Sequence, residues 1–127
     1  MTFTFNPAHG VIRVNAEIEG PLRTASLILT LDTGATRTTI DETALIGVGY
    51  NPAQASLQLP VTMGSASLQV PLLTVSRLQA LGQDRSNLPV FAHQFPSTAS
   101  SDGVLGLDFF AGMVLTLDFR QGTITLS

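Results

Sequence analysis

Apolar and polar residues alternate along most of this chain, which predicts β-strands from near its beginning to its end. In residues 11–18 (VIRVNAEI) the aliphatic side chains at even positions alternate with polar ones, as in a strand with one buried face. A turn is expected at Glu19-Gly20-Pro21. It is followed by a returning strand over residues 22–31, with leucines at alternate positions on one face.

The middle of the chain continues this pattern around one short helix and one long hairpin. Residues 41–46 are expected to form about one or two helical turns that stop at Gly47. Residues 56–73 (SLQLPVTMGSASLQVPLL) predict a hairpin whose alternating arms flank a small, flexible tip at residues 63–66. The polar segment GQDRSNLP then predicts a connection, before a strand with the sequence VFAHQF.

Short elements are expected in the last part of the chain. SSDG predicts a turn and VLGL a further apolar stretch, after which residues 108–113 fit a short helix with Asp108 as its N-cap. Residues 114–119 (VLTLDF) and 123–126 (TITL) predict a final hairpin. Because no linker or low-complexity segment interrupts this pattern, we expect a mostly-β single domain over residues 1–127 with one or two short helices.

The composition fits one ordinary folded domain and excludes several classes of function. The chain has 127 residues, of which 44% are hydrophobic, so it can bury a core without disulfides. It contains no cysteine, which excludes a thiolate metal site and a cysteine nucleophile. Six arginines, no lysine and nine acidic residues give a net charge of −3, unlike the basic surface of a nucleic-acid or anionic-membrane binder.

The N-terminal segment MTFTFNPAHG lacks both the charged region and the continuous apolar region of a signal peptide. The longest apolar stretches are too short to span a bilayer. We therefore expect a soluble, cytoplasmic protein with no membrane partner.

One acidic residue, Asp32, stands where an apolar strand ends, in the stretch LILTLDTGATRTTI. A buried lone carboxylate is costly unless it is paired, hydrogen-bonded or neutralised. Gly34 permits a tight turn in which backbone N–H groups hold the carboxylate at the mouth of a cleft. The tripeptide alone is equally compatible with a capping or turn aspartate, so the rest of the chain must distinguish the two.

Three further features follow in order: a glycine-tipped hairpin, the segment Val104-Leu105-Gly106, and the short helix that precedes VLTLDF. Together with Asp32-Thr33-Gly34-Ala35, this order resembles that of the retropepsin-like aspartic proteases, including their bacterial single-domain members. The resemblance spans roughly residues 11–126. It implies a closed, orthogonal β-barrel-like fold in which the apolar-apolar-Gly segment packs beneath the Asp-Thr-Gly turn and the hairpin forms a flap.

The resemblance also implies a partner for Asp32. The chain contains one Asp-Thr-Gly sequence, whereas a pepsin-type chain carries two, so a symmetric homodimer is expected to place the Asp32 carboxylates of two copies face to face. The pair would share a proton, with one carboxylate activating a water and the other donating to the peptide carbonyl. The implied activity is endopeptidase cleavage of an extended peptide or protein, with no cofactor and no metal.

The resemblance assigns roles to individual residues. Thr33 is expected to bond across the dimer axis. Ala35 stands where pepsin-like relatives usually carry Ser. The hydroxyl of that Ser favours the charged form of the carboxylate, so its absence here predicts a less acidic working pH than that of the pepsin type. The implied catalytic residues are Asp32, Thr33 and Gly34, and the implied substrate-binding residues are Ala35, Thr36, Met63, Gly64, Ser65, Val104 and Leu105.

Two departures from the retroviral pattern bear on how subunits associate. Thr36 and Leu107 stand where retroviral members carry an Asp and an Arg that pair with each other, so this support is missing. The chain also continues past VLTLDF into RQGTITLS, whereas retroviral enzymes end near that point and use their terminal strand in the interface. The strands that join the subunits therefore stay undetermined at the level of sequence.

Several alternatives stay open. The hairpin over residues 59–71 is either the flap over the substrate or a plain exposed hairpin. Arg37 either points into a subsite and favours acidic side chains or is solvated at the surface. His9 and His93 lack metal-ligand spacing and are expected to be surface or strand residues. The domain as a whole is a protease, a non-catalytic peptide-binding domain of the same fold, or a protease that dimerises too weakly to act when dilute.

Overall fold

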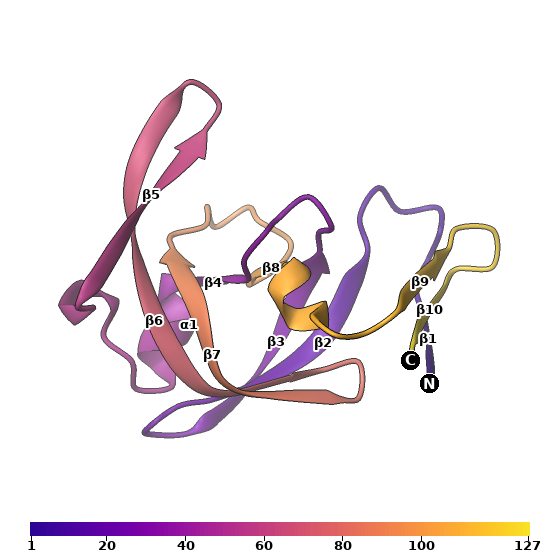
Figure 1. Cartoon of the computed structure of the whole chain (residues 1–127), viewed down its shortest axis with the longest axis horizontal. Coiled ribbons are helices and arrows are strands. Elements are labelled where there is room, and N and C mark those ends of the chain that lie inside the picture. Colours follow the sequence, from indigo (N-terminus) through magenta and orange to yellow (C-terminus); the bar gives the residue numbers. More distant parts are fainter.

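The computed structural model describes residues 1–127, with the exception of the Met63 side chain. The described chain contains ten strands, one α-helix and two short 3-10 helices (Figure 1). Their bounds are β1 (Thr2–Thr4), β2 (Arg13–Glu19), β3 (Thr24–Leu31), β4 (Thr39–Asp41), α1 (Glu42–Gly47), η1 (Pro52–Gln54), β5 (Leu57–Met63), β6 (Ala66–Ala80), β7 (Gln83–His93), β8 (Gly103–Leu105), η2 (Leu107–Phe110), β9 (Leu115–Asp118) and β10 (Thr123–Leu126). The predicted mostly-β architecture with a few short helices is confirmed.

Seven strands form one sheet that closes on itself into a barrel. The hydrogen-bonded order is β2-β3-β8-β4-β7-β6-β5, and an additional pairing of β2 with β6 closes the ring. Closure leaves β5 outside the ring, as the outer arm of the β5–β6 hairpin, which projects from the barrel in Figure 1. Because closure removes exposed strand edges, the ring strands need no further partner for their backbone groups. The predicted closed barrel is confirmed.

The short strand β8 determines where the Asp32 turn lies. On one side β8 pairs in parallel with the end of β3, with Leu105 opposite Leu31, and on the other side it pairs antiparallel with β4. Asp32 follows β3 directly, and Gly106 follows β8 directly. Because parallel strands end at the same edge of a sheet, this pairing brings the Asp32 turn and the segment after β8 together.

Alternation in β2 and β3 places their aliphatic side chains inside the barrel. Ile18 and Leu29 have no exposed surface, whereas Asn15 on the opposite face is exposed. Phe109 of η2 is also fully buried. Each fully buried side chain of this size stabilises the fold by roughly 1.5–3 kcal/mol relative to exposure. The core therefore anchors both the strand that leads to Asp32 and the 3-10 helix that follows β8.

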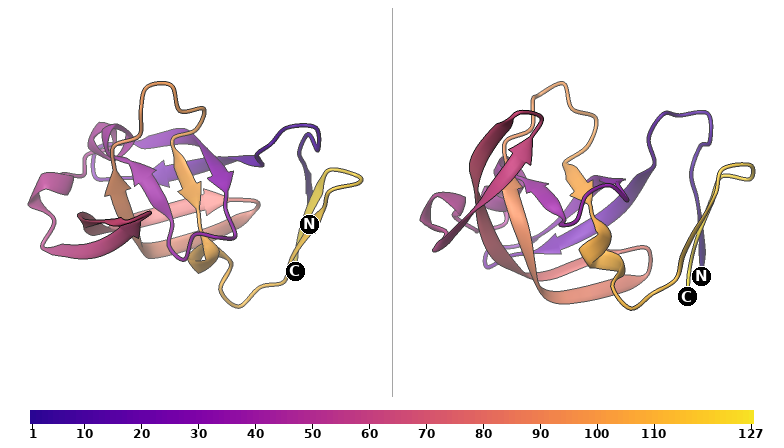
Figure 2. Two further views of the ribbon diagram at one scale, coloured as in Figure 1. Left: turned by 90° about the horizontal axis from the view of Figure 1, so that it is seen from above. Right: turned by 45° about the horizontal axis from the view of Figure 1, so that its top comes forward.

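The two ends of the chain form a separate three-stranded sheet in the order β1-β10-β9, termed the terminal sheet. Figures 1 and 2 show it beside the barrel, with the N- and C-termini next to each other. The ammonium group of Met1 donates to the Leu126 carbonyl at 3.3 Å. The predicted β9–β10 hairpin is confirmed. Strand β1 was missed, although the alternation in TFTF is a weak signal for it.

The composition of the polar segment GQDRSNLP predicts a connection, and this prediction is wrong. The segment lies almost entirely in strand β7. Strands β6 and β7 are joined instead by a tight turn at Leu81 and Gly82, both of which have positive φ. The segment is extended because pairing with β6 satisfies its backbone, while its side chains stay exposed or half-buried on both faces. Local composition therefore gave the wrong prediction at a place where a long partner strand decides the structure.

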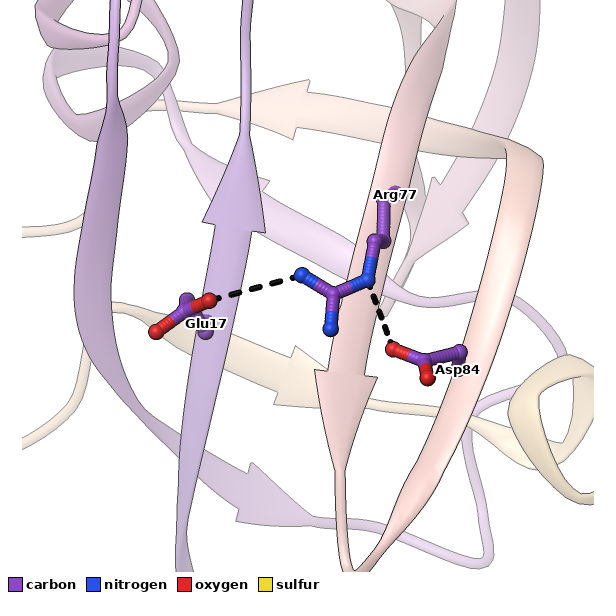
Figure 3. Close-up of polar contacts among 3 residues, drawn as sticks. All are labelled: Glu17, Arg77 and Asp84. Carbon is purple, nitrogen blue, oxygen red and sulfur yellow. Dashed lines mark hydrogen bonds and ion pairs between the residues drawn. The ribbon is translucent and has the colours of Figure 1, made fainter.

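Arg77 on β6 links three strands of the barrel through ion pairs (Figure 3). Its Nε donates to Asp84 of β7 at 2.7 Å, and its Nη1 lies 3.4 Å from Glu17 of β2. The hydrogen bond to Asp84, with a further contribution from Glu17, raises the pKa of Arg77 above its ordinary value. These contacts tie the polar part of β7 to the seam where β2 and β6 close the barrel.

The two predicted helices differ in outcome. The helix expected over residues 41–46 is confirmed as α1, shifted by one residue. The helix expected over residues 108–113 is instead the 3-10 helix η2, and the prediction of Asp108 as its N-cap is wrong: Gly106 occupies that position. The Asp108 carboxylate is bound to Thr38 and so does not cap the helix. In the part of the chain that the structure describes, no helix is long and apolar enough to cross a membrane.

Candidate active site

The Asp32 turn leaves strand β3 and presents its carboxylate to solvent. The Asp32 N–H donates to the Leu105 carbonyl at 3.0 Å, so the turn begins on the β3–β8 pair. The carboxylate Oδ1 accepts the Gly34 N–H at 2.9 Å, and the Ala35 N–H donates to the Asp32 carbonyl at 3.2 Å. Because Asp32 is exposed, the carboxylate avoids the cost that a lone charge would carry in the core.

Gly106 allows the segment after β8 to pass directly beneath this turn. A Cβ atom at Gly106 would lie 2.7 Å from the carbonyl carbon of Arg37 and 2.9 Å from the Ala35 carbonyl oxygen. The next residue, Leu107, donates its N–H to the same Ala35 carbonyl at 2.8 Å. Leu105 is fully buried in the core. The apolar-apolar-Gly segment therefore packs against the turn, as the resemblance implies.

A buried threonine, Thr38, fastens the end of the turn to η2. Its N–H lies 3.0 and 3.1 Å from the two carboxylate oxygens of Asp108, and its hydroxyl donates to Asp108 Oδ1 at 2.8 Å. The same hydroxyl accepts the Gly106 N–H at 3.1 Å. Thr38 has no exposed surface, and hydrogen bonds to a charged group are stronger there than neutral ones. This contact ties the end of the turn to η2 within one chain.

A hollow of about 350 Å³ lies on one side of Asp32, between the turn, the N-terminal loop and the terminal sheet. Asp32 is the one acidic residue among the described residues that line it. Apolar side chains face solvent at its rim, since Phe119 is 64% exposed and Val11 is 40% exposed. The lining residues are His9, Gly10, Val11, Ile12, Thr30, Leu31, Asp32, Thr33, Leu117 and Phe119. The carboxylate therefore borders an open, partly apolar surface.

A second cavity of about 200 Å³, termed the hairpin pocket, lies between the β5–β6 hairpin and the barrel. Val104 contributes to it from β8, next to the segment beneath the turn. The complete lining is Thr39, Val61, Val70, Phe91, His93, Phe95 and Val104. A largely apolar wall with few polar groups suits a side chain of a bound peptide.

Five of the sequence-predicted site residues are consecutive in the turn after β3. Asp32, Thr33, Gly34 and Thr36 are exposed, and Ala35 is half-buried. Gly34 lies close to the carboxylate, since a Cβ atom there would stand 3.2 Å from Asp32 Oδ1. The turn thus brings together the three residues expected to be catalytic.

The other five predicted site residues lie elsewhere. Val104 lines the hairpin pocket, whereas Leu105 is buried in the core, where it supports the turn and does not face a cavity. Gly64 and Ser65 are exposed at the tip of the β5–β6 hairpin. The side chain of Met63 lies outside the described residues.

Sequence reasoning missed Thr38 and most of the hairpin pocket. Nothing local distinguishes Thr38 from its neighbouring threonines, because its partner Asp108 is 70 positions away. For Phe91 and His93 the signal is their alternate spacing in VFAHQF, which puts both on the pocket side of β7. His93 is a half-buried strand residue, in agreement with its predicted place in a strand. Within the described residues no group of three His, Asp or Glu side chains is placed to hold a metal ion.

Two comparisons with known proteins give a match. The model of a family described as aspartyl protease matches residues 14–109. A crystal structure of a retropepsin-like aspartic protease from Rickettsia conorii matches with a TM-score of 0.75 at 12% sequence identity, covering 99% of this chain and 88% of that one. At this identity the likeness shows a shared fold. No curated protein matches the sequence. The family match includes Asp32, Thr38 and Gly106.

Proposed function

This chain belongs to the aspartyl protease family, with a retropepsin-like fold, and from this membership we propose that it is an endopeptidase active as a homodimer. Each of two copies contributes one Asp32, and the paired carboxylates hydrolyse a peptide bond of an extended substrate. The observation that carries the proposal is the exposed Asp32 carboxylate, held by the Gly34 N–H on a turn that Gly106 and Thr38 support from beneath.

The reaction uses the two carboxylates in different protonation states. Like charges at close range do not both ionise easily, so the pair shares one proton. The ionised carboxylate takes a proton from a water molecule, which attacks the peptide carbonyl carbon, while the protonated carboxylate donates to the carbonyl oxygen. The tetrahedral intermediate collapses as a proton passes to the leaving amine nitrogen. The two Asp32 side chains thus supply both the general base and the general acid.

The terminal sheet and the hollow beside Asp32 support the homodimer. Identical carboxylates meet only if a two-fold axis passes close to Asp32, which brings Thr33 to the axis as well. Within the described chain, β1 and β9 are the outer strands of the terminal sheet, and outer strands present backbone groups to a second chain. Exposed apolar side chains, including Phe119 and Val114, lie on or beside this sheet. These surfaces favour an interface that includes the terminal sheet.

The β5–β6 hairpin serves as the flap in this proposal. Its tip contains Gly64 with φ of 63°, a conformation that glycine adopts without strain. An extended peptide lies between the hairpin and the Asp32 turns and bonds through main-chain groups. One of its side chains occupies the hairpin pocket, where Val61 and Val70 of the hairpin face Val104 of the barrel. Mobile hairpins over a site are a common way to admit substrate and then exclude water.

The rival function is a peptide-binding domain of the same fold that does not catalyse. The hairpin pocket would serve a binder equally well. The exposed Asp32-Thr33-Gly34 turn favours the enzyme, because peptide binding alone gives no reason to bring two carboxylates together at a dimer axis. A protease that dimerises weakly would look like a binder at low concentration.

The test is cleavage of a diverse peptide mixture by the parent protein and by Asp32→Asn, from about pH 4 to 7. The assay is run at several protein concentrations while the oligomeric state is recorded. Cleavage by the parent alone, rising more steeply than linearly where the dimer is partly dissociated, supports the shared-carboxylate protease. A stable dimer that cleaves nothing over this range favours the binding domain.

A further inference from the structure

Arg37 differs from the other half-buried arginines of the chain in what surrounds its guanidinium. Three arginines are half-buried. Arg77 has two carboxylate partners (Figure 3), and Arg85 donates to two backbone carbonyls at 2.8 and 2.9 Å. Arg37 has neither kind of partner within the described residues, and its guanidinium carbon lies over the Phe91 ring, 5.5 Å from the ring centroid.

Phe91 connects Arg37 to the hairpin pocket, since it forms part of the pocket lining. Its N–H donates to the Thr38 carbonyl at 3.0 Å, and it lies opposite Thr39 in the β4–β7 pair. Thr39 also lines the pocket. Thr38, which lies between Arg37 and Thr39 in the sequence, instead turns inward to Asp108. Arg37 lies in the bend before β4 and is not itself part of the pocket lining, so its place beside the pocket rests on the contact of its guanidinium with Phe91.

The chemistry of this position calls for an acceptor from outside the chain. A guanidinium has five N–H donors, and partial burial without an acceptor is unfavourable unless water or a ligand supplies one. The nearest acidic residue along the chain, Asp41, binds the Phe95 N–H at 3.0 Å, and among the described residues it forms no hydrogen bond or ion pair with Arg37. A carboxylate of a bound peptide would satisfy two of the Arg37 donors at once.

We infer that Arg37 selects substrates that carry an acidic side chain beside the residue occupying the hairpin pocket. The inference rests on the proposed function and names its substrate class as peptides in which Asp or Glu accompanies an apolar residue. In the symmetric dimer each subunit contributes one Arg37 and one hairpin pocket, so the acidic preference falls on both sides of the cleaved bond. Arg37 acts on the choice of substrate, while the Asp32 pair carries out the chemistry.

The experiment measures two properties of the same diverse peptide mixture: cleavage by the parent protein and binding to Asp32→Asn. Both are repeated with Arg37→Gln, which keeps part of the side-chain stem over Phe91 but removes the charge, and with Arg37→Glu. Arg23→Glu is the control for Arg37→Glu, because it changes the net charge by the same amount. Arg23 is exposed in the connection between β2 and β3. Thermal unfolding of each variant verifies that it is folded.

At one position of the peptide on each side of the cleaved bond, an acidic residue in place of alanine is expected to raise kcat/KM for the parent protein roughly five- to tenfold. The same replacement is expected to raise the affinity for Asp32→Asn by roughly the same factor. The preference disappears in Arg37→Gln, turns towards basic residues in Arg37→Glu and persists in Arg23→Glu. A parent without acidic preference, or a preference unchanged in Arg37→Gln, overturns the inference. Selective binding without cleavage upholds it and contradicts the endopeptidase, whereas peptides that are neither bound nor cleaved contradict both.

Discussion

Thr38 donates to Asp108 through both its backbone N–H and its hydroxyl, at 2.8 to 3.1 Å, across 70 positions of the chain. The contact joins the end of the Asp32 turn to the start of η2, the two segments that meet beneath the carboxylate. Because the Thr38 hydroxyl also accepts the Gly106 N–H, a small group of polar contacts inside an apolar core positions the turn. We therefore expect both the stability of the fold and the geometry of the site to depend on this group.

Replacing Thr38 by Val keeps the shape of the side chain and removes its hydroxyl. The Gly106 N–H and the Asp108 carboxylate each lose a buried partner, so we expect the free energy of unfolding to fall by about 1–3 kcal/mol. Denaturant unfolding measures this loss, and peptide cleavage should fall with it. Thr36→Val makes the same chemical change at an exposed position and should have little effect on the free energy of unfolding. Equal effects of the two variants would show that the Thr38 contact contributes nothing special.

Gly106→Ala tests whether the turn needs the close approach beneath it. The added Cβ meets the backbone of Arg37 and Ala35, which cannot rotate away as a side chain can. We expect a loss of about 1–3 kcal/mol in stability and a displaced Asp32 turn with weaker cleavage. Gly47→Ala is the control, because nothing lies within 4 Å of that Cβ and alanine is favoured in a helix. A fully active, equally stable Gly106→Ala variant would contradict the role given to this glycine.

Ala35→Ser tests the expected pH dependence. Ala35 lies on the Asp32 turn and offers the carboxylate no hydroxyl. A serine hydroxyl there donates to the charged form and favours it, so the cleavage optimum should shift to lower pH in the variant and lie at less acidic pH in the parent. Rates across the pH range measure both optima, with Ala66→Ser on the hairpin as the control. A parent optimum close to about pH 2 would count against this explanation.

The ion pairs around Arg77 should stabilise the barrel seam in a manner that depends on salt but not on pH near neutrality. Because the folded protein raises the pKa of Arg77, the stability that this group contributes is fully present below its ordinary pKa and is lost only in strong base. Arg77→Gln should therefore lower the unfolding midpoint by the same small amount at pH 6 and pH 9, a range of about 3 units over which arginine stays charged. The loss should shrink as salt is added. A loss that salt does not change would instead indicate packing of the Arg77 stem.

Alternation predicted those elements whose two faces have different surroundings. In β2 and β3, Ile18 and Leu29 are buried on one face, whereas Asn15 on the opposite face is exposed. Both predicted strands are confirmed. The segment GQDRSNLP has no such contrast, and its strand depends on pairing with β6 and on the contact of Asp84 with Arg77. Those partners are set by the three-dimensional fold, so local composition gave the wrong prediction.

The candidate site divides in the same way. Asp32 and Gly106 lie in short motifs that can be recognised from consecutive residues. The structure brings these two motifs together through the β3–β8 pair. The bond between Thr38 and Asp108 joins residues that carry no local mark of their pairing. The hairpin pocket likewise draws its lining from five separate strands and the residues beyond β7, which alternation alone does not assemble.

The hydrogen bond between Met1 and Leu126 spans 125 positions, so the terminal sheet closes a loop of nearly the whole chain. Because closing so long a loop is entropically costly until the intervening segment has folded, we expect this sheet to be the last part of the protein to form. If the subunits associate through the terminal sheet, a chain whose barrel and Asp32 turn have already formed has no partner for its Asp32 until this sheet is complete as well, so proteolysis is the last property that the folding protein acquires.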